Sequence, residues 1–352
     1  MVETAVHAGK LTRKVHRPDL LLFAALFHDI GKGTEEDHSE RGVRLIEPIA
    51  RRIGFDEKDV ETLKLLVQHH LLLSATATRR DLDDPATIQS VVSLIPDANT
   101  LELLHALSIA DGEATGSAGW SDWKATLVAE LVSRVRKAMT GFEVAQQPML
   151  SEAQITLAAK GELKISLEEH SSGYAVEVIS PDKPGLLSIV AGVFSISRLD
   201  VKSASTKTLG SSAVMYWIVT PEPYAPAVTE SGLHRLIVDA LNDSTDLEEK
   251  LVARAKTYAS IPTIPVPDPE VEIFTDAATD ATIIEVRSHD RPGLLFRIGV
   301  AITQSKIDIR SAIVTTLGAE AIDTLYVTEL TGGPLSPERA SEVASHLKQA
   351  LK

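Results

Sequence analysis

The second half of the sequence contains an internal repeat, which limits the possible folds more than any other feature. Residues 179–210 align without a gap to residues 287–318, at a constant offset of 108 residues. The aligned stretches share a DKPG or DRPG turn, an apolar run of helical character and a β-rich run that ends in Leu-Gly. A gap-free match across turn, helix and strand predicts a duplicated βαββα unit. The two copies have matching strand edges and could pair side by side, a point that the sequence leaves open.

The first copy illustrates the elements that we expect in both. The stretch YAVEVIS at 174–180 alternates as a strand does, and LLSIVAGVFSISR at 186–198 has helical character. Two β-rich runs follow at 201–209 and 212–220, separated by a glycine–serine turn. A second helix is expected at 233–241. Each copy therefore predicts a mixed unit of strands and helices.

The residues before the repeat are expected to form a helical bundle. Apolar side chains recur at helical spacing through residues 1–140, and Gly, Asp and Pro mark the joins. Between the copies, IPTIPVPDPE at 261–270 favours a linker or the approach to a strand, because each proline removes a ladder donor. The patterns predict five segments: a helical domain at 1–145, a linker at 146–172, the first copy at 173–255, a proline-rich linker at 256–280 and the second copy at 281–352.

Composition excludes several classes of protein. The 352 residues are 44% hydrophobic and 24% charged, which is typical of a soluble chain with two or three domains. A net charge of −14 argues against a broad nucleic-acid-binding role. The sequence shows neither a secretory apolar region nor a run long enough to cross a bilayer, so we expect a cytoplasmic protein without membrane contact. Without cysteine, any metal must be held by histidine and carboxylate groups.

Potential metal ligands collect at predicted helix ends in the helical domain. They are His28-Asp29 in FAALFHDIGKG, His38, the pair His69-His70, and Asp111. A polar pair at the end of a buried helix is costly unless something satisfies it, and a metal ion does so. The alternative for each histidine is a hydrogen-bonded core residue, or a position near the negative end of a helix dipole. The recurrence of these residues within one small domain favours a metal site.

The same stretches resemble the HD superfamily of metal-dependent phosphohydrolases, through HDIGKG, HSERG, QHH and SIAD. More narrowly, RPDLLLFAALFHDIGKG, HLLLSATATRRDLDDP and LSIADGEATG resemble the bifunctional uridylyltransferase/uridylyl-removing enzymes that act on the nitrogen signal protein PII. The resemblance covers essentially the whole chain, because that family ends in two tandem ACT domains. It implies a multidomain fold: an all-α HD bundle followed by two α+β ferredoxin-like (βαββαβ) ACT domains.

The resemblance also implies a metal site and a reaction. The implied ligands are His28, Asp29, His38, His70 and Asp111. Asp29 would be the bridging carboxylate, and family register favours His70 over His69. These ligands suit Mg²⁺ or Mn²⁺, and also Fe or Zn. Asp29 and Lys32 would be catalytic, although Lys32 could equally be a solvated lysine beyond the helix end. The implied reaction hydrolyses the nucleotidyl-tyrosine phosphodiester on PII and releases UMP or AMP.

The sequence departs from the resembling family in two places. The N-terminal nucleotidyltransferase domain is missing, so we expect no nucleotide transfer by this chain. An earlier family histidine would fall immediately before VETAV, where the sequence begins. His7 lies two helical turns further along, roughly 10 Å away, too far to replace it. We therefore expect a truncated first helix and an incomplete metal site. This favours a rival function, a catalytically inactive HD domain joined to a glutamine-binding regulatory module.

The repeated DKPGLL and DRPGLL turns predict amino-acid sites. Glycine permits close approach, and the start of the next helix offers free N–H groups to a carboxylate. An aspartate at the start of the following strand could accept an ammonium group. The predicted residues are Asp182, Gly185, Leu186 and Asp200 in the first copy, and Asp290, Gly293, Leu294 and Asp308 in the second. The alternative is a plain strand-to-helix turn capped by Asp182 or Asp290. The resemblance implies glutamine as the ligand, at one or both copies.

The preferred function is a uridylyl-removing phosphodiesterase that acts on PII and is regulated by glutamine through tandem ACT domains. The ACT domains also offer contacts for a homo-oligomer. A third alternative is a (p)ppGpp hydrolase with HD and ACT domains. The duplication of the ACT pattern and the SATATRRDL string both argue against it.

Overall fold

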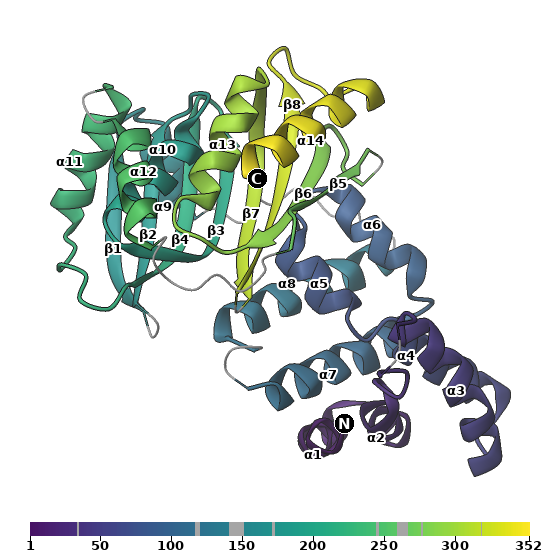
Figure 1. Ribbon diagram of the computed structural model, residues 1–352. Coiled ribbons are helices and arrows are strands. Elements are labelled where there is room, and N and C mark those ends of the chain that lie inside the picture. The colour runs from purple at the N-terminus through teal and green to yellow at the C-terminus, as the bar shows by residue number, and fades with distance from the viewer. Residues whose placement is uncertain are drawn as a thin grey trace. The chain divides into compact units, whose positions relative to one another are not determined.

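The chain folds into two compact units, residues 1–147 and 148–352, which are described separately below. Figure 1 shows the helices and strands of the computed structural model. The structure describes residues 1–33, 35–116, 120–140, 151–170, 173–243, 246–258, 267–275, 277–317 and 319–352. Within these ranges, no helix combines the length and the apolar character needed to cross a membrane.

The first unit is helical throughout its described part. Its helices are α1 (Val2–Leu11), α2 (Pro18–Phe27), α3 (His38–Ile53), α4 (Glu57–Gln68), α5 (Leu72–Arg79), α6 (Pro85–Leu94), α7 (Ala98–Ala114) and α8 (Asp122–Met139), with a short 3₁₀ helix at Thr12–Lys14. Helix α7 is central, because it packs against α1, α2, α4, α5 and α8. Its Leu101, Leu104 and Leu107 are fully buried, and each such side chain stabilises the fold by roughly 1.5–3 kcal/mol.

Aspartate side chains begin several of these helices. Asp37 accepts hydrogen bonds from the backbone N–H groups of Ser39 and Glu40, and Asp56 and Asp97 cap α4 and α7 in the same way. Each cap stabilises its helix by about 0.5–2 kcal/mol. The cap at Asp37 fixes the start of α3 and therefore the position of His38, its first residue.

The second unit is an eight-stranded antiparallel sheet. Its strands are β1 (Lys164–His170), β2 (Gly173–Pro181), β3 (Leu199–Leu209), β4 (Ser212–Pro221), β5 (Glu270–Phe274), β6 (Thr282–His289), β7 (Ile307–Leu317) and β8 (Glu320–Glu329). They lie in the order β1-β2-β4-β3-β7-β8-β6-β5. Its helices are α9 (Glu152–Ala158), α10 (Leu186–Ile196), α11 (Glu230–Leu241), α12 (Leu247–Tyr258), α13 (Leu294–Gln304) and α14 (Pro337–Leu351). Figure 1 shows α10 and α13 side by side on the sheet.

The two sequence copies form two similar halves of this sheet, here called the first repeat (164–258) and the second repeat (270–351). Each half has the order ββαββα, followed in the first repeat by α12. The predicted fold class, a helical bundle followed by ferredoxin-like ACT-type units, is confirmed. One detail differs from the expected βαββαβ order, since the outer strand precedes each unit instead of following its last helix. The edge position of each repeat can be filled by a strand that comes before the repeat's other elements or by one that follows its last helix.

The range 146–172, predicted as a linker, contains regular structure. Within it, α9 begins with a capping box at Ser151, and β1 pairs antiparallel with β2. The prediction of a linker is therefore wrong for these two elements. Sequence reasoning missed β1 because its polar residues give little alternation of apolar side chains, and its pairing with β2 supplies the stability. Residues 261–266 of the proline-rich stretch lie outside the described ranges, and β5 follows them.

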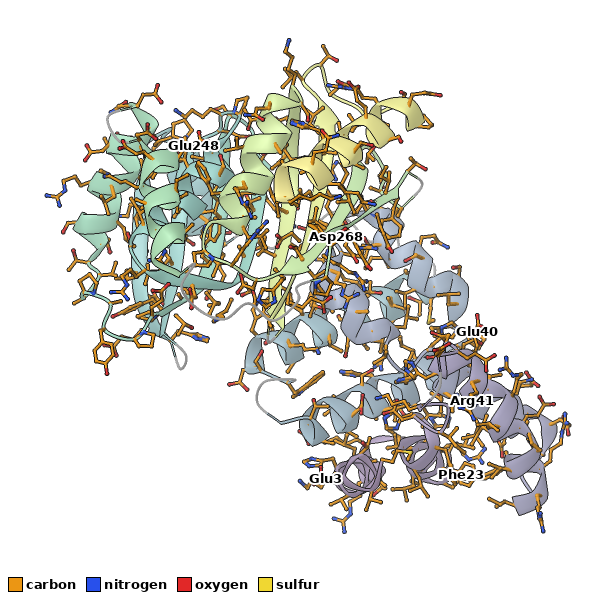
Figure 2. All side chains as sticks on the ribbon, in the orientation of Figure 1. Glu3, Phe23, Glu40, Arg41, Glu248 and Asp268 are labelled. Atoms are coloured by element: carbon orange, nitrogen blue, oxygen red, sulfur yellow. The ribbon has the colours of Figure 1, made fainter. Side chains whose placement is uncertain are left out.

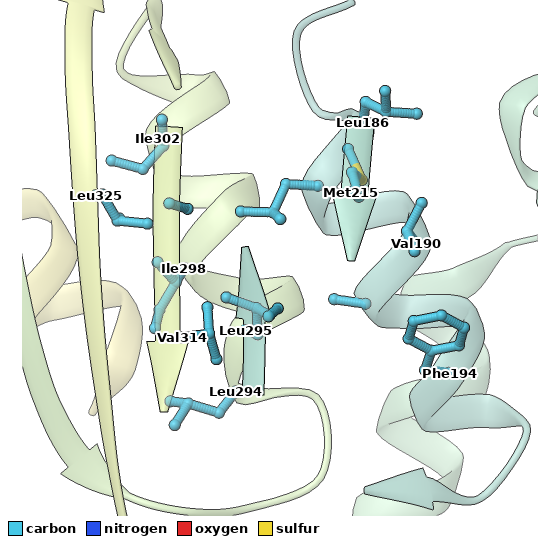
Figure 3. Close-up of a cluster of buried hydrophobic side chains, with 14 of the residues drawn as sticks. Leu186, Val190, Phe194, Met215, Leu294, Leu295, Ile298, Ile302, Val314 and Leu325 are labelled. Atoms are coloured by element: carbon cyan, nitrogen blue, oxygen red, sulfur yellow. The ribbon is translucent and has the colours of Figure 1, made fainter. Parts of the chain in front are cut away.

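The repeats pair through their central strands. Strands β3 and β7 run antiparallel, with Ser203 opposite Thr315 and Lys207 opposite Ser311. A single buried cluster of apolar side chains runs beneath α10 and α13 and includes residues of both repeats. Figure 3 shows part of it, with Leu186 and Met215 from the first repeat and Leu294 and Val314 from the second. The side-by-side pairing that the sequence left open is thus observed.

Candidate metal centre and inter-repeat cavities

Two buried histidines of the helical unit are held in the same way. His28 directly follows α2, and His70 lies two residues after the end of α4. The Nδ1 atom of His28 lies 3.0 Å from the carbonyl oxygen of Ala25, and that of His70 lies 2.7 Å from the carbonyl oxygen of Val67. Because a carbonyl only accepts, each Nδ1 carries the proton. In the neutral form of each ring, Nε2 then has a lone pair, the arrangement that a metal-binding histidine requires.

Asp29 lies at the centre of these histidines. Its Oδ2 is 3.3 Å from Nε2 of His28, and its Oδ1 is 3.6 Å from Nε2 of His70 and 3.9 Å from Nε2 of His38. Asp111, on α7, completes the group with its Oδ1 3.0 Å from Nε2 of His28. The structure therefore brings together all five residues that the resemblance implied as ligands. Their role as ligands remains a prediction.

Close packing between the α2–α3 loop and α3 positions His38. Gly31 lies so near the start of α3 that a Cβ atom there would be 1.9 Å from the carbonyl oxygen of His38. Only glycine fits at this approach. Figure 2 shows Glu40 and Arg41 in the first turn of α3, and Arg41 also donates to the carbonyl oxygen of Gly31 at 3.4 Å. These contacts hold the loop that carries Asp29 against the helix that carries His38.

The donor atoms fit a divalent cation. One ligand atom from each of Asp29, His38 and His70 lies within 4.8 Å of the others. Two ligands that each lie about 2.0–2.2 Å from one ion are themselves roughly 3–4 Å apart, which matches the separations from Asp29. Among the described residues, Oδ1 of Asp29 and Nε2 of His28 are buried and make no geometrically acceptable hydrogen bond. Buried polar atoms without a partner are costly, and a cation would satisfy both.

The charges of the cluster depend on one another. Burial opposes the charged form of His28, but Asp111 and Asp29 outweigh it and raise its pKa to about 9. Burial alone would raise the pKa of Asp29 and of Asp111, whereas the contacts with His28 lower both. The pKa of His70 is lowered, mainly by burial. A cation bound among these groups would supply the positive charge that the His28 proton otherwise provides.

Two basic side chains lie near the cluster, Lys32 and Lys124, and Arg79 lies near Lys124; the sequence indicated only Lys32. Lys32 is 62% exposed, and its Nζ lies 2.6 Å from Oδ2 of Asp29. Lys124, on α8, is close enough to Asp111 and to Arg79 for both to affect its pKa, which burial lowers. Arg79 belongs to the family-specific string quoted above, which could have indicated it. Lys124 is distant in sequence and carries no local signal.

His69 and His7 differ in position from the histidines around Asp29. His70 is buried and faces Asp29, while the adjacent His69 is only partly buried. The choice of His70 as the ligand stays a prediction, and His70 is the one of the two whose Nε2 faces Asp29. His7 is partly buried, and its Nδ1 lies 2.7 Å from Oε2 of Glu113.

The eight residues predicted around the repeated turns line two cavities. Each cavity combines the turn of one repeat with the strand of the other. The larger, of about 500 Å³, is lined by Asp200 of the first repeat with Asp290, Gly293 and Leu294 of the second. The smaller, of about 20 Å³, is lined by Asp182, Gly185 and Leu186 of the first repeat with Asp308 of the second. We call them the open cavity and the closed cavity. The crossing of repeats was not visible in the sequence.

The turn glycines start the two helices. Gly185 and Gly293 have φ values of 84° and 78°, a left-handed conformation that favours glycine. They precede α10 and α13, whose first N–H groups point out of the helix. This geometry agrees with the sequence prediction of a strand-to-helix turn at both positions.

Family comparisons agree with this architecture. Residues 1–116 match the HD domain, and residues 282–345 match the ACT domain. This chain carries an HD domain and an ACT domain. The first repeat shares the topology of the ACT-matching second repeat. An HD domain supports a hydrolase role and binding of a divalent metal, as the cluster around Asp29 also does.

The curated relatives agree with the resemblance drawn from the sequence. The chain is 39% identical to the bifunctional uridylyltransferase/uridylyl-removing enzyme of Streptomyces coelicolor, over 100% of this chain and 48% of the relative. It is 38% identical to the enzyme of that name from Mycobacterium tuberculosis H37Rv, over 100% of this chain and 45% of the relative. With the Gluconobacter oxydans enzyme it shares 31% identity, over 94% and 41%. The predicted relationship is confirmed, and the chain spans about half the length of these relatives.

Proposed function

We propose that this chain is a metal-dependent phosphodiesterase that removes a nucleotidyl group from the PII signal protein in the cytoplasm, under the control of glutamine. The observation that carries the proposal is the position of Asp29, which lies within 4 Å of histidine nitrogens from three helix ends. Similarity to uridylyl-removing enzymes supports the choice of substrate.

The chain's own residues would act as follows. His28, His38, His70, Asp29 and Asp111 would hold one or two divalent ions, with Mg²⁺ or Mn²⁺ suited to their oxygen and imidazole donors. Such an ion lowers the pKa of water and neutralises charge on a phosphodiester. The carbonyl groups of Ala25 and Val67 orient His28 and His70, so that their Nε2 atoms face Asp29.

The basic residues around the cluster suit a phosphodiester substrate. Lys32 lies at the exposed side of Asp29, Lys124 lies near Asp111, and Arg79 lies near Lys124. Positive charge from these side chains would attract and orient the phosphate. These residues are compatible with the release of either UMP or AMP. Which nucleotide is removed therefore has to be measured.

Glutamine control belongs to the sheet unit. Its open cavity has about 500 Å³ and lies at the start of α13, a volume that suits a small amino acid. The N–H groups at the start of α13 favour a carboxylate, and Asp200 and Asp290 favour an ammonium group. An amino acid such as glutamine therefore matches the groups that line this cavity.

The test measures metal content and hydrolysis in the same preparation. Elemental analysis of the purified chain is combined with Mn²⁺-dependent hydrolysis of bis-p-nitrophenyl phosphate, and with release of UMP or AMP from modified PII. We expect bound metal and turnover, both lost in Asp29→Ala. Added glutamine should increase the release from PII.

A matched pair of histidine variants sharpens this test. His70→Ala should lose metal and turnover, whereas His69→Ala should retain both, because only His70 faces Asp29. Absence of metal and turnover in the unmodified chain, with glutamine binding preserved, would refute the enzyme. It would leave the rival function, a glutamine-binding regulatory module with an inactive HD domain.

A further inference from the structure

The open and closed cavities are built from equivalent positions of the two repeats. Asp290, Phe296 and Asp323 line the open cavity, and the residues 108 positions earlier, Asp182, Ser188 and Met215, line the closed one. The other wall follows the same rule, with Asp200 in the open cavity and Asp308 in the closed one. The two cavities are therefore related by the pseudo-twofold symmetry of the sheet.

Despite this symmetry, the cavities differ greatly in volume. The closed cavity, about 20 Å³, has room for about one water molecule. The open cavity, about 500 Å³, is within the usual range for a small-molecule site. Since the backbone arrangement is shared, side chains at the equivalent positions must cause the difference.

One cause is the spacing of α10 and α13. At the closed cavity, Ser188 packs tightly on Gly299, where an added Cβ would lie 2.6 Å from the Cβ of Ser188. At the open cavity, the position equivalent to Ser188 holds Phe296, whose ring lies against Gly192. The Phe296 ring is bulkier than Ser188. It therefore keeps the start of α13 apart from α10, whereas the start of α10, with Ser188, packs closely on α13.

A second cause is the residue in the middle of the fourth strand of each repeat. Met215 on β4 extends into the closed cavity and is fully buried. Asp323 on β8 takes the equivalent place in the open cavity, where its side chain is shorter and polar. The turn aspartates differ as well. The Thr208 hydroxyl donates to Asp182 at 2.7 Å, whereas the equivalent Thr316 donates to the backbone of Val201.

Asp323 is an unusual residue for its place in the middle of strand β8, between two apolar neighbours. It is only 2% exposed and lies between Val286 and Val314 on the neighbouring strands. Its Oδ1 makes no hydrogen bond within the described part of the chain. Burial, with the nearby charge of Asp290, raises the pKa of Asp323 to about 8. A buried carboxyl oxygen without a partner is unfavourable for folding, and contact with a ligand would satisfy it.

We infer that the two cavities are not equivalent, that only the open cavity takes the effector, and that Asp323 recognises the ammonium group of a small amino acid there. The inference rests on the proposed glutamine control and adds the site, the stoichiometry and the recognising residue. Asp290 and Asp200, which line the same cavity, add to the attraction for a cationic group. The closed cavity serves only as packing between the repeats.

Calorimetric titration of the full chain with L-glutamine tests the stoichiometry. We expect one ligand per chain, affinity lowered at least tenfold in Asp323→Asn, and no detectable binding in Asp323→Met. Methionine is accepted at the equivalent position of the first repeat, so the last variant should fold, as circular dichroism will check. Met215→Leu is the matched control and should bind like the unmodified chain. Two ligands per chain, or unchanged affinity in Asp323→Asn, would overturn the inference.

A ligand without the amino group separates recognition from a structural role. Glutaramate, which is glutamine without its α-amino group, should bind the unmodified chain at least tenfold more weakly than glutamine. In Asp323→Asn this preference should largely disappear. If instead both ligands weaken equally, Asp323 only supports the fold of the cavity, and the inference fails.

Proton release gives an independent readout. An ammonium group beside Asp323 favours its ionised form, so binding near neutral pH should release a proton from the unmodified chain but not from Asp323→Asn. The charged groups that line the same cavity are Arg198, Asp200, Glu222, Asp290 and Arg291. The heat of binding should therefore vary with the ionisation enthalpy of the buffer only when Asp323 is present. Equal variation in both proteins would contradict the role of Asp323.

These results are distinguishable from a failure of the proposed function. If another small amino acid binds once per chain and depends on Asp323, the inference holds while glutamine control fails. If none of the twenty common amino acids binds, the inference is refuted. The hydrolysis assay on the same preparation then decides independently whether the helical unit is a phosphodiesterase.

Discussion

Asp29 in the helical unit and Asp323 in the sheet unit are both largely buried carboxylic acids, yet their surroundings have opposite effects. Asp29 lies among histidines and beside Lys32, and these contacts lower its pKa despite burial. Asp323 lies among valines and near Asp290, and its pKa is raised to about 8. Fixed positive partners keep a carboxylate charged and suited to hold a cation. An apolar wall keeps it neutral until a partner arrives.

The largest effect should come from removing the charge at the metal cluster. Asp29→Asn keeps the size of the side chain but removes the group that all three histidines face. We expect Mn²⁺-dependent hydrolysis to fall by at least about 1,000-fold, because charge stabilisation by bound metal supplies several kcal/mol. Initial rates with bis-p-nitrophenyl phosphate measure it. Asp268→Asn, at an exposed position of the sheet unit, is the control. Activity within tenfold of normal would show that Asp29 is not central to catalysis.

His69 and His70 allow a second comparison within the helical unit, with a smaller expected effect on metal binding. His70→Ala should weaken metal binding by about 100-fold, because it removes an oriented ligand, while His69→Ala should change it less than threefold. Metal competition with a chelator dye gives both affinities. The reverse order would mean that His69, and not His70, belongs to the site.

Asp323 should make the protein less stable as pH rises. A carboxylate with a positive partner has the opposite effect. Its pKa rises on folding, so the native protein holds the proton that the unfolded chain loses above pH 4. The free energy of unfolding of the sheet unit should therefore fall as pH rises from 5 to 8, by at least about 2 kcal/mol from this group.

The comparison with Asp323→Asn isolates that contribution. Denaturant unfolding, followed by the fluorescence of the buried Trp217, should show a shallower decline for the variant over the same pH range. Parallel curves for the two proteins would mean that Asp323 does not titrate in this range. The comparison with Asp29 would then lose its basis.

The smallest effect is expected at Lys32. Its side chain is 62% exposed, so its contact with Asp29 is screened by solvent. Lys32→Ala should lower hydrolysis by at most about tenfold, mainly through weaker attraction of the phosphate. Steady-state kinetics should show the change in KM more than in kcat. A loss comparable with that of Asp29→Asn would assign Lys32 a direct part in the reaction.

The helical unit shows how far local sequence can indicate a site. His28, Asp29, the pair His69-His70 and Asp111 were indicated by polar residues that follow apolar helical runs, and His38 by the predicted start of a helix. The structure places His28, Asp29, His38, His70 and Asp111 together. Helix ends are visible in a sequence because caps and apolar periodicity are local. Lys124 was missed because it comes from a separate helix, and nothing in its own neighbourhood relates it to Asp111.

In the sheet unit, the duplication, the turns at Gly185 and Gly293, and the mixed strand and helix composition could all be predicted from the sequence. That each cavity joins the turn of one repeat to the strand of the other is seen only in the folded chain. Tertiary structure also decided that Asp323 and Met215 occupy equivalent positions, one in a cavity of about 500 Å³ and one in a cavity of about 20 Å³. The physical reason is that turns and periodicity depend on near neighbours along the chain. The pairing of β3 with β7, and the helix spacing set by Phe296 and Ser188, depend on contacts between residues about a hundred positions apart.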